Sequence, residues 1–252
     1  MLRIYLSGRM SIEGDDGVLI HPGDFPGQQG RAAFAVLVGE RHAPITRTAL
    51  ADALWPAELP PSWESALSAI LSKLRSLLGR AGLDASALTT RDGCHELRLP
   101  TATWIDHEVA ADSIHEAEAA LKAGDPAAAY GPSAVAHHIA RRPFLPAETG
   151  PWFERRRERL AGILVRALEC RAQVYIWNRE FPLALEVARQ AIALQPFRET
   201  GHQLLMRAHA GAGNTAEALR AYEQCRAMIA DELGVSPSPE TRALHTELLR
   251  SL

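Results

Sequence analysis

The sequence has few cysteines, and their placement excludes two classes of small stabilised domain. Three occur in 252 residues, far apart in the chain, at Cys94, Cys170 and Cys225. An odd number without a Cys-X-X-Cys pair indicates neither a disulfide framework nor a zinc-binding module. We therefore expect a fold stabilised by its hydrophobic core, with no metal or other cofactor.

Long apolar runs are also missing. No stretch approaches the roughly eighteen consecutive apolar residues of a membrane-spanning helix, and the N-terminus, MLRIYLSGRM, lacks the apolar segment of a signal peptide. We expect a cytoplasmic protein with no membrane partner. The composition, 47% hydrophobic and 23% charged, is ordinary for a globular protein, and the length allows one large or two medium domains.

Positive charge is not in excess. The formal net charge is -3, and residues 1–99 carry about as many acidic as basic side chains. This excludes a broad basic surface for nucleic acid and leaves room for a local basic patch. Features of enzymes are absent too, because the sequence has no nucleophile-base arrangement, no metal-ligand spacing and no phosphate-binding loop. We do not expect an enzyme.

The first part of the chain predicts a small sheet followed by a helix. Apolar and polar residues alternate in Leu2–Ser7, Met10–Glu13 and Val18–Ile20, which is typical of short antiparallel strands. Gly23–Gly30 is rich in glycine and predicts a loop, and Arg31–Val38 predicts a short apolar helix.

Two helices separated by a short turn follow. In Ile45–Pro56 the Thr46 side chain can cap the first turn, and the final proline cannot continue the helix. After a pair of prolines, Ser62 is expected to cap a longer helix that extends to Gly79. A short helix, a turn and a longer helix make a helix-turn-helix arrangement.

The longer helix has two contrasting faces. Apolar residues recur at helical spacing on one face, at Trp63, Leu67, Ile70, Leu71, Leu74 and Leu78. The candidate DNA-binding residues of this helix are small, polar or cationic: Ser65, Ser68, Ala69, Ser72, Lys73 and Arg75. Small side chains allow close approach, and flanking cations suit the phosphate-walled major groove. A solvated surface helix is the alternative, and Arg75 could instead pair with an acid of its own domain.

A β-hairpin is predicted after this helix. Leu88–Leu99 forms two apolar-polar segments around Asp92-Gly93, a dipeptide typical of tight hairpin turns. A hairpin directly after a recognition-type helix is the wing of a winged helix, and Arg91 near its tip could reach a phosphate or the minor groove. We therefore predict an α+β winged helix-turn-helix domain in residues 1–99.

The remaining residues, 100–252, predict an all-α domain. Glycine and proline breakers separate helices at about Asp106–Ala123, Pro126–Ala140, Trp152–Trp177, Pro182–Leu194, Glu199–Ala212, Thr215–Leu233 and Pro239–Leu249. Ala184-Leu185 and Ala218-Leu219 lie one tetratricopeptide period apart, as do Trp177 and Gly211. This spacing indicates stacked, tetratricopeptide-like helix pairs. The charged run Glu154–Arg159 is interpreted as a solvated, salt-bridged helix face and not as a second DNA site, with an interdomain or polymerase contact as the alternative.

Several motifs together resemble one family, the SARP-type bacterial transcriptional activators. The motifs are LADALWP, the Pro60-Pro61 pair, LSKLRSLLG, WFERRRERL, LLMRAHAGAGNTAEALRAYEQCR and, most specifically, DELGVSPSPETRALHTELL. The resemblance implies an OmpR-like winged helix followed by a bacterial transcriptional activator domain. It places base-facing or phosphate-facing positions at Ser65, Ala69, Ser72 and Lys73. It also implies binding to double-stranded DNA at promoter repeats, self-association on DNA and contact with RNA polymerase.

These observations favour a sequence-specific DNA-binding transcriptional regulator, and the resemblance favours an activator. The alternative is a helical sensor or scaffold whose winged helix contacts protein and does not bind DNA. The serine-rich helix face and the balanced charge of residues 1–99 support this alternative.

Overall fold

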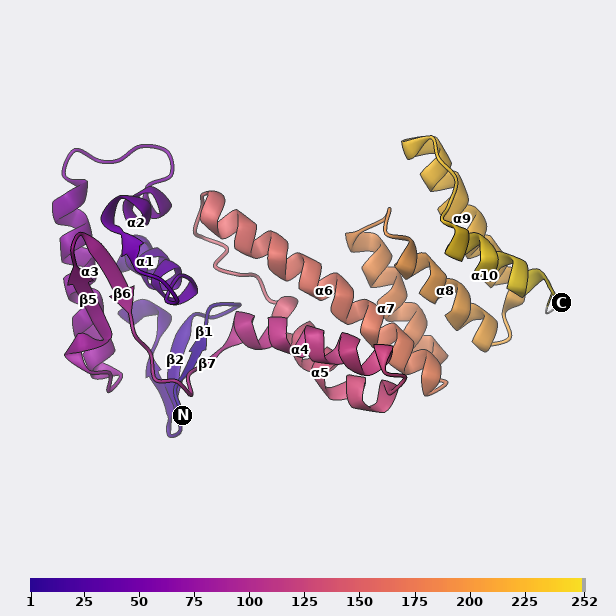
Figure 1. The fold of residues 1–252 in the computed structure, drawn as a ribbon, viewed down its shortest axis with the longest axis horizontal. Coiled ribbons are helices and arrows are strands. Elements are labelled where there is room, and N and C mark those ends of the chain that lie inside the picture. Colours follow the sequence, from indigo (N-terminus) through magenta and orange to yellow (C-terminus); the bar gives the residue numbers. More distant parts are fainter. Residues whose placement is uncertain (251–252) are drawn as a thin grey trace. The chain divides into compact units, whose positions relative to one another are not determined.

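The computed structural model describes residues 1–250 and places the chain in two compact units (Figure 1). The first unit consists of Met1–Val109 and Ile139–Leu160, and the second of Ala110–His138 and Ala161–Leu252. Both units are therefore discontinuous in sequence. The boundary between residues 99 and 100 stays a prediction.

A four-stranded sheet opens the first unit. It contains β1 (Arg3–Tyr5), β2 (Ser11–Gly14), β3 (Gly17–Ile20) and β7 (Trp104–Ile105), in the order β3-β2-β1-β7. The predicted antiparallel strands near the N-terminus are confirmed. Sequence reasoning did not find β7, which pairs with β1 in parallel. A strand of two residues is too short to show an alternating pattern.

Asp106, directly after β7, connects the end of β7 to the backbone just after β1. Its carboxylate oxygen Oδ2 accepts hydrogen bonds from the backbone N–H groups of Leu6 at 2.9 Å and Ser7 at 2.7 Å. All three residues are buried. Buried backbone donors need such a partner, so the carboxylate fixes the end of β1 against the start of the next helix.

Three helices, two short 3-10 helices and a second sheet complete the N-terminal part of this unit. The elements in chain order are η1 (Pro22–Asp24), α1 (Gly27–Gly39), β4 (Ile45–Thr46), α2 (Arg47–Leu54), α3 (Trp63–Arg80), η2 (Ala85–Ala87), β5 (Leu88–Arg91) and β6 (Cys94–Leu97). The second sheet has the order β4-β6-β5.

The prediction of a loop over Gly23–Gly30 is wrong in its second half, because α1 already begins at Gly27. A stretch rich in glycine predicts a loop, because glycine weakens helices. Gly30 instead lies inside the helix, where a Cβ atom would be 2.3 Å from the ring of Pro26.

The two predicted helix caps have different outcomes. Thr46 caps α2 as expected, since its hydroxyl accepts a hydrogen bond from the backbone N–H of Ala49 at 3.2 Å. Ser62 occupies the predicted N-cap position of α3, but within the described residues its side chain accepts no capping hydrogen bond. The Ser65 hydroxyl donates to the Ser62 carbonyl at 2.9 Å, which satisfies a different backbone group.

The first turns of α6 (Pro151–Trp177) belong to the same unit and pack on α1. Trp152 Nε1 donates to Glu40 at 2.7 Å, and Arg156 donates to Glu40 and to the Gly39 carbonyl, both at 3.0 Å. Arg157 donates to three backbone carbonyls, those of Phe144, Leu145 and Glu148. The run is salt-bridged, as predicted, through Arg156 and Glu40. It is not solvated along its whole length, because the side chains of Arg156 and Arg157 are partly buried in these contacts.

Within residues 106–250 every regular element is a helix, and the seven helices predicted from the sequence are confirmed. They are α4 (Asp106–Lys122), α5 (Pro126–Ala140), α6, α7 (Phe181–Leu194), α8 (Glu199–Gly211), α9 (Thr215–Leu233) and α10 (Pro239–Arg250). Their observed ends lie within two residues of the expected ends, because glycine and proline breakers act locally. Figure 1 shows α7, α8 and α9 stacked in chain order.

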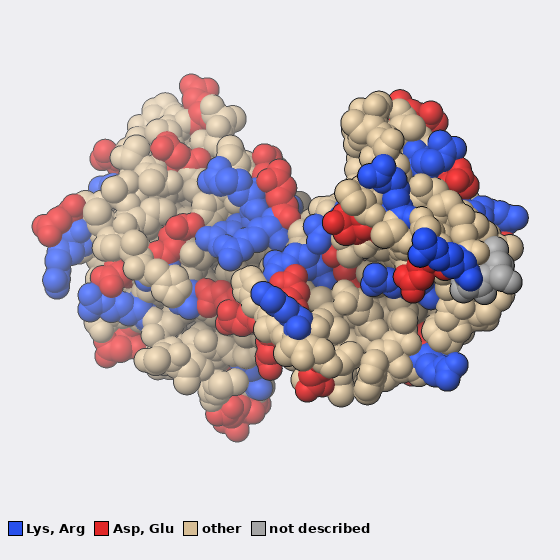
Figure 2. Space-filling model, turned by 45° about the vertical axis from the view of Figure 1, so that its right-hand side comes forward, with Lys and Arg blue, Asp and Glu red and all other residues tan. Residues whose placement is uncertain are grey.

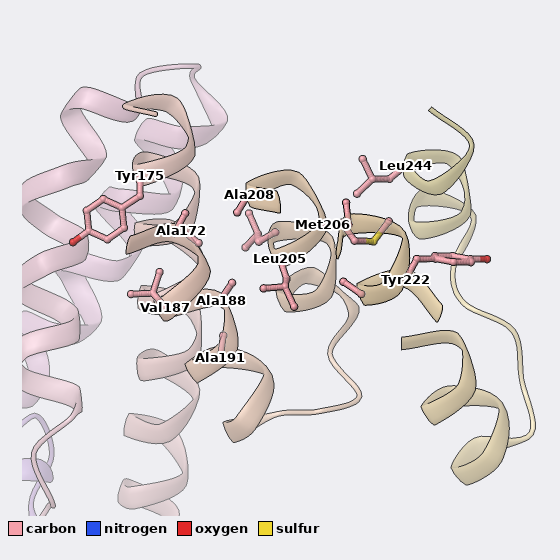
Figure 3. Packing of buried hydrophobic residues seen from close by; sticks show 14 of the residues in the cluster. Ala172, Tyr175, Val187, Ala188, Ala191, Leu205, Met206, Ala208, Tyr222 and Leu244 are labelled. Carbon is pink, nitrogen blue, oxygen red and sulfur yellow. The ribbon is translucent and has the colours of Figure 1, made fainter. Parts of the chain in front are cut away.

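Alanine and other small residues allow close packing at the centre of this stack. Ala184 and Ala218, one predicted repeat apart, are fully buried, as is Ala208. Figure 3 shows the alanine, leucine and methionine side chains of this cluster between successive helices. At the end of α8, a Cβ atom on Gly211 would lie 2.4 Å from the ring of Phe181. The predicted period thus corresponds to tetratricopeptide-like helix packing.

The last helix is fixed to α8 by one carboxylate. Glu199, the first residue of α8, accepts hydrogen bonds from the backbone N–H of Ser238 at 2.9 Å and its hydroxyl at 2.8 Å, and from the hydroxyl of the fully buried Thr241. Burial by itself raises the pKa of Glu199, but these hydrogen bonds outweigh it and hold the pKa below its usual value. The ionised carboxylate therefore orders the start of α10.

Candidate nucleic-acid interface

The exposed face of α3 carries most of the candidate residues. On its inner side Leu67, Leu71 and Leu74 are at most 3% exposed. Five candidates project from the helix into solvent, namely Ser65, Ser68, Ala69, Ser72 and Lys73. Helical periodicity was sufficient to predict this, because residues three or four apart share a face.

Arg75 has a different environment from these five residues. It is half-buried, and its guanidinium donates from Nε to the Leu88 carbonyl at 2.9 Å and from Nη2 to the Thr90 hydroxyl at 2.7 Å. These bonds connect α3 to β5. The alternative interpretation, an ion pair with an acid, is not what the described residues show, because Arg75 bonds a carbonyl and a hydroxyl.

The hairpin formed by β5 and β6 has the turn that its sequence predicts. Asp92 and Gly93 both have left-handed backbone angles, with φ of 51° and 74°. Two successive residues of this kind give the turn twist that suits adjacent antiparallel strands. Arg91 lies directly before the turn, opposite Cys94, and is exposed.

His95 on β6 extends the contact between α3 and the hairpin. Its Nδ1 lies 2.9 Å from the Thr90 hydroxyl, which already accepts a hydrogen bond from Arg75. The ring is 3% exposed, and its Nε2 is buried with no hydrogen-bond partner among the described residues. Burial, and then the guanidinium groups of Arg75 and Arg47, lower the pKa of His95. The ring is therefore held neutral.

Arg47, the first residue of α2, is a candidate that sequence reasoning missed. Its backbone N–H donates to the carbonyl of Gly93 in the hairpin turn at 3.0 Å. Its side chain reaches the exposed face of α3, where Nη2 donates to the Ser68 hydroxyl at 2.9 Å and to the Glu64 carbonyl at 2.6 Å. The guanidinium carbon lies 5.7 Å from the centre of the Trp63 ring.

A signal for Arg47 was present in the sequence. A cation directly after an N-cap threonine opposes the helix dipole, which favours negative charge in the first turn. Such an unfavourable placement indicates that the charge serves something other than helix stability. Helical spacing along α3 does not reveal Arg47, because Arg47 lies on α2.

Some cations of the first unit form ion pairs and others do not. Several arginines pair with carboxylates, namely Arg31, Arg41, Arg80, Arg98 and Arg156. Arg47, Lys73, Arg75 and Arg91, on α2, α3 or β5, form no ion pair with any described residue. The same holds for other cations of this unit, such as Arg3 and Arg157, which donate to backbone carbonyls. Figure 2 shows the two signs of charge interspersed on the face in view.

Residues 1–250 contain neither a metal-ligand cluster nor a helix able to span a membrane. These residues contain no cluster of three or more His, Cys, Asp or Glu side chains able to hold a metal ion. None of their helices combines the length and the apolar character needed to cross a bilayer.

Known proteins similar to this chain are bacterial regulators. The family model described as "Bacterial transcriptional activator domain" matches residues 105–249. The "Regulatory protein AfsR" of Streptomyces coelicolor is 30% identical over 88% of this chain and 22% of its own length. The "Transcriptional regulatory protein EmbR" of Mycobacterium tuberculosis is 29% identical over 87% of this chain and 57% of its own length.

A solved structure agrees with these matches over nearly the whole chain. The structure of Mycobacterium tuberculosis EmbR in complex with a low-affinity phosphopeptide superimposes with a TM-score of 0.86 at 26% identity, covering 99% of this chain and 65% of that chain. The present chain therefore spans about a fifth of the AfsR length and a little over half of the EmbR length.

Proposed function

Because the chain belongs to the family of the bacterial transcriptional activator domain, the SARP-type regulators, we propose that it is a sequence-specific DNA-binding transcriptional activator. In this proposal α2, α3 and the hairpin of β5 and β6 form a winged helix-turn-helix. One observation carries the proposal: the small exposed side chains of α3 lie beside cations that have no carboxylate partner among the described residues.

In the proposed mode of binding, α3 enters the major groove. Ser65, Ser68, Ala69 and Ser72 are small enough to let the helix backbone approach the base edges, and serine hydroxyls can bond several bases. Lys73 neutralises a phosphate on one side of the groove. Arg91, at the tip of the hairpin, contacts the adjacent backbone or the minor groove.

A single copy bound in this way has few phosphate contacts and weak affinity. Useful occupancy requires two copies on adjacent promoter repeats or a second protein. We therefore propose that the helical domain supplies the additional contacts, through self-association on DNA and through RNA polymerase. Stacked helix pairs are suited to this, since such arrays commonly bind other chains.

The test is fluorescence anisotropy of the purified protein on labelled duplexes from the region upstream of its own gene, at several salt concentrations. We expect one fragment to bind more tightly than unrelated DNA of equal length. Lys73→Ala should weaken binding to all sequences and reduce the slope of log K against log salt by about one. Equal, weak binding to every duplex, unchanged by the substitution, would instead favour a protein-interaction module.

A further inference from the structure

Arg47 of α2 and Arg75 of α3 are both partly buried arginines, yet their environments are opposite. Arg75 points toward the hairpin and uses two of its donors on β5, one to a carbonyl and one to a hydroxyl. Arg47 points toward the exposed serine face of α3, where it bonds Ser68. This difference assigns different roles to two residues of the same type.

The guanidinium of Arg47 is fixed in place before any ligand binds. Its Nη2 donates two hydrogen bonds to α3, the ring of Trp63 lies beside its carbon atom, and its backbone is bonded to the hairpin turn. Arginine loses little further conformational freedom when its planar group is already held in this way. The remaining terminal nitrogen, Nη1, makes no hydrogen bond within the described residues, so it stays available as a donor.

The charge on Arg47 is not balanced inside the described protein. No described carboxylate lies within ion-pair distance of it, and its Nε is buried without a partner among the described residues. Arg75 adds positive charge nearby, since both guanidinium groups act on His95. The N-terminal end of α2 adds a further partial positive charge. Together these groups favour an anion next to Ser68, the residue at the centre of the proposed DNA-binding face.

We propose that Arg47 is a phosphate-binding residue of the DNA interface, whereas Arg75 is a positioning residue that holds the hairpin against α3. This inference rests on the proposed function. It moves one predicted contact from α3 to α2, and it means that Arg75 acts on DNA only through the position of the hairpin. The phosphate bound by Arg47 lies beside the first half of α3, next to Ser68.

Four variants of the full chain separate the two roles. Arg47→Gln removes the charge but keeps an amide that can donate to Ser68, and Arg47→Lys keeps the charge. Arg75→Gln and Arg75→Lys are the matched pair. Each variant is measured by anisotropy on the duplex bound by the parent protein and on unrelated DNA, across a salt series, and by thermal melting.

For Arg47→Gln we expect about tenfold weaker binding to both duplexes, a salt slope smaller by about one and a melting temperature close to that of the parent. Arg47→Lys should recover most of the affinity. For Arg75→Gln we expect the melting temperature to fall by roughly 3–6 °C. Arg75→Lys should not restore it, because an ammonium cannot reproduce the two fixed donors of the guanidinium.

Two results would overturn the inference while leaving the proposed function intact. In the first, Arg47→Gln binds DNA with parental affinity and slope although Lys73→Ala weakens binding. In the second, Arg47→Gln lowers the melting temperature as much as Arg75→Gln does, which would make Arg47 a structural residue. A parent protein that binds no duplex at all would contradict the proposed function, and this inference with it.

Discussion

His95 is a neutral base in a place where a third positive charge would be costly. Thr90 accepts a hydrogen bond from Arg75, so its single hydroxyl proton is free to point toward His95 Nδ1. That arrangement needs an unprotonated Nδ1. Protonation would place a charge in a buried site near other cations: burial, and then the guanidinium groups of Arg75 and Arg47, lower the pKa of His95.

The lowered pKa of His95 predicts a direction for stability against pH. Its folded-state pKa lies below the unfolded value of about 6.5, so the unfolded chain binds the proton more readily. The stability contributed by neutral His95 is complete above pH 6.5 and is lost as the pH falls toward the folded-state pKa. We expect the urea midpoint to decrease between pH 7.5 and pH 5.5. The free energy of unfolding falls by at most about 1.4 kcal/mol per pH unit, the limit for one titrating group.

The measurement is urea unfolding followed by tryptophan fluorescence, since four tryptophans, at positions 55, 63, 104 and 152, lie in the first unit. His95→Asn is the control, because its amide can replace the bond to Thr90 without titrating. Burial also lowers the pKa of His209 in the second unit. The quantity to compare across pH is therefore the difference in free energy of unfolding between the parent and His95→Asn. A difference that is independent of pH would contradict the prediction.

At the scale of helices, the crossing of α7 and α8 depends on the absence of a side chain at Gly211. An added Cβ would lie 2.4 Å from Cε1 and 2.8 Å from Cζ of Phe181, so the ring or the helix must move. Overpacking of this kind costs about 1–3 kcal/mol, which exceeds the gain of roughly 1 kcal/mol from replacing glycine by alanine in a helix. We expect Gly211→Ala to lower the free energy of unfolding.

Gly162 provides the matched control for this substitution. It lies inside α6, and a Cβ there would meet no other atom within 4 Å. Gly162→Ala should therefore leave the melting temperature unchanged or raise it by helix propensity alone. Equal effects of the two substitutions on urea or thermal unfolding would show that close packing against Phe181 does not determine the choice of glycine.

The success of sequence prediction at this scale follows from how local each signal is. The breakers and caps that delimit α4 to α10 are a few residues long, and the exposed positions of Ser65 to Lys73 follow from helical period alone. The pairing of β7 with β1 and the contact of Arg47 with Ser68 join residues distant in the chain. No local pattern specifies such pairs, so Arg47 was missed, and the bonds of Arg75 to β5 were not foreseen.

At the scale of the molecule, the first compact unit is built from segments on both sides of residues 110–138. Glu148, 3% exposed, pairs with Arg31 of α1 at 3.1 Å, and Phe153 of α6 is 1% exposed. Asp106 supplies the acceptor for two buried backbone amides of the N-terminal strand region. A fragment that ends at Leu99 contains none of these partners, although it contains all of the proposed DNA-binding residues.

We therefore expect residues 1–99 alone to unfold without cooperativity. Two buried amides without an acceptor cost about 1–3 kcal/mol each, a large part of the roughly 5–15 kcal/mol that stabilises a typical domain. The loss of β7, of Glu148 and of Phe153 adds to this. A fragment of residues 1–160 keeps every segment of the unit and is the control; it should melt cooperatively by circular dichroism and tryptophan fluorescence. A sharp transition in the shorter fragment would instead support a domain boundary at residue 99, and would mean that the start of α6 is dispensable for the fold that carries α3.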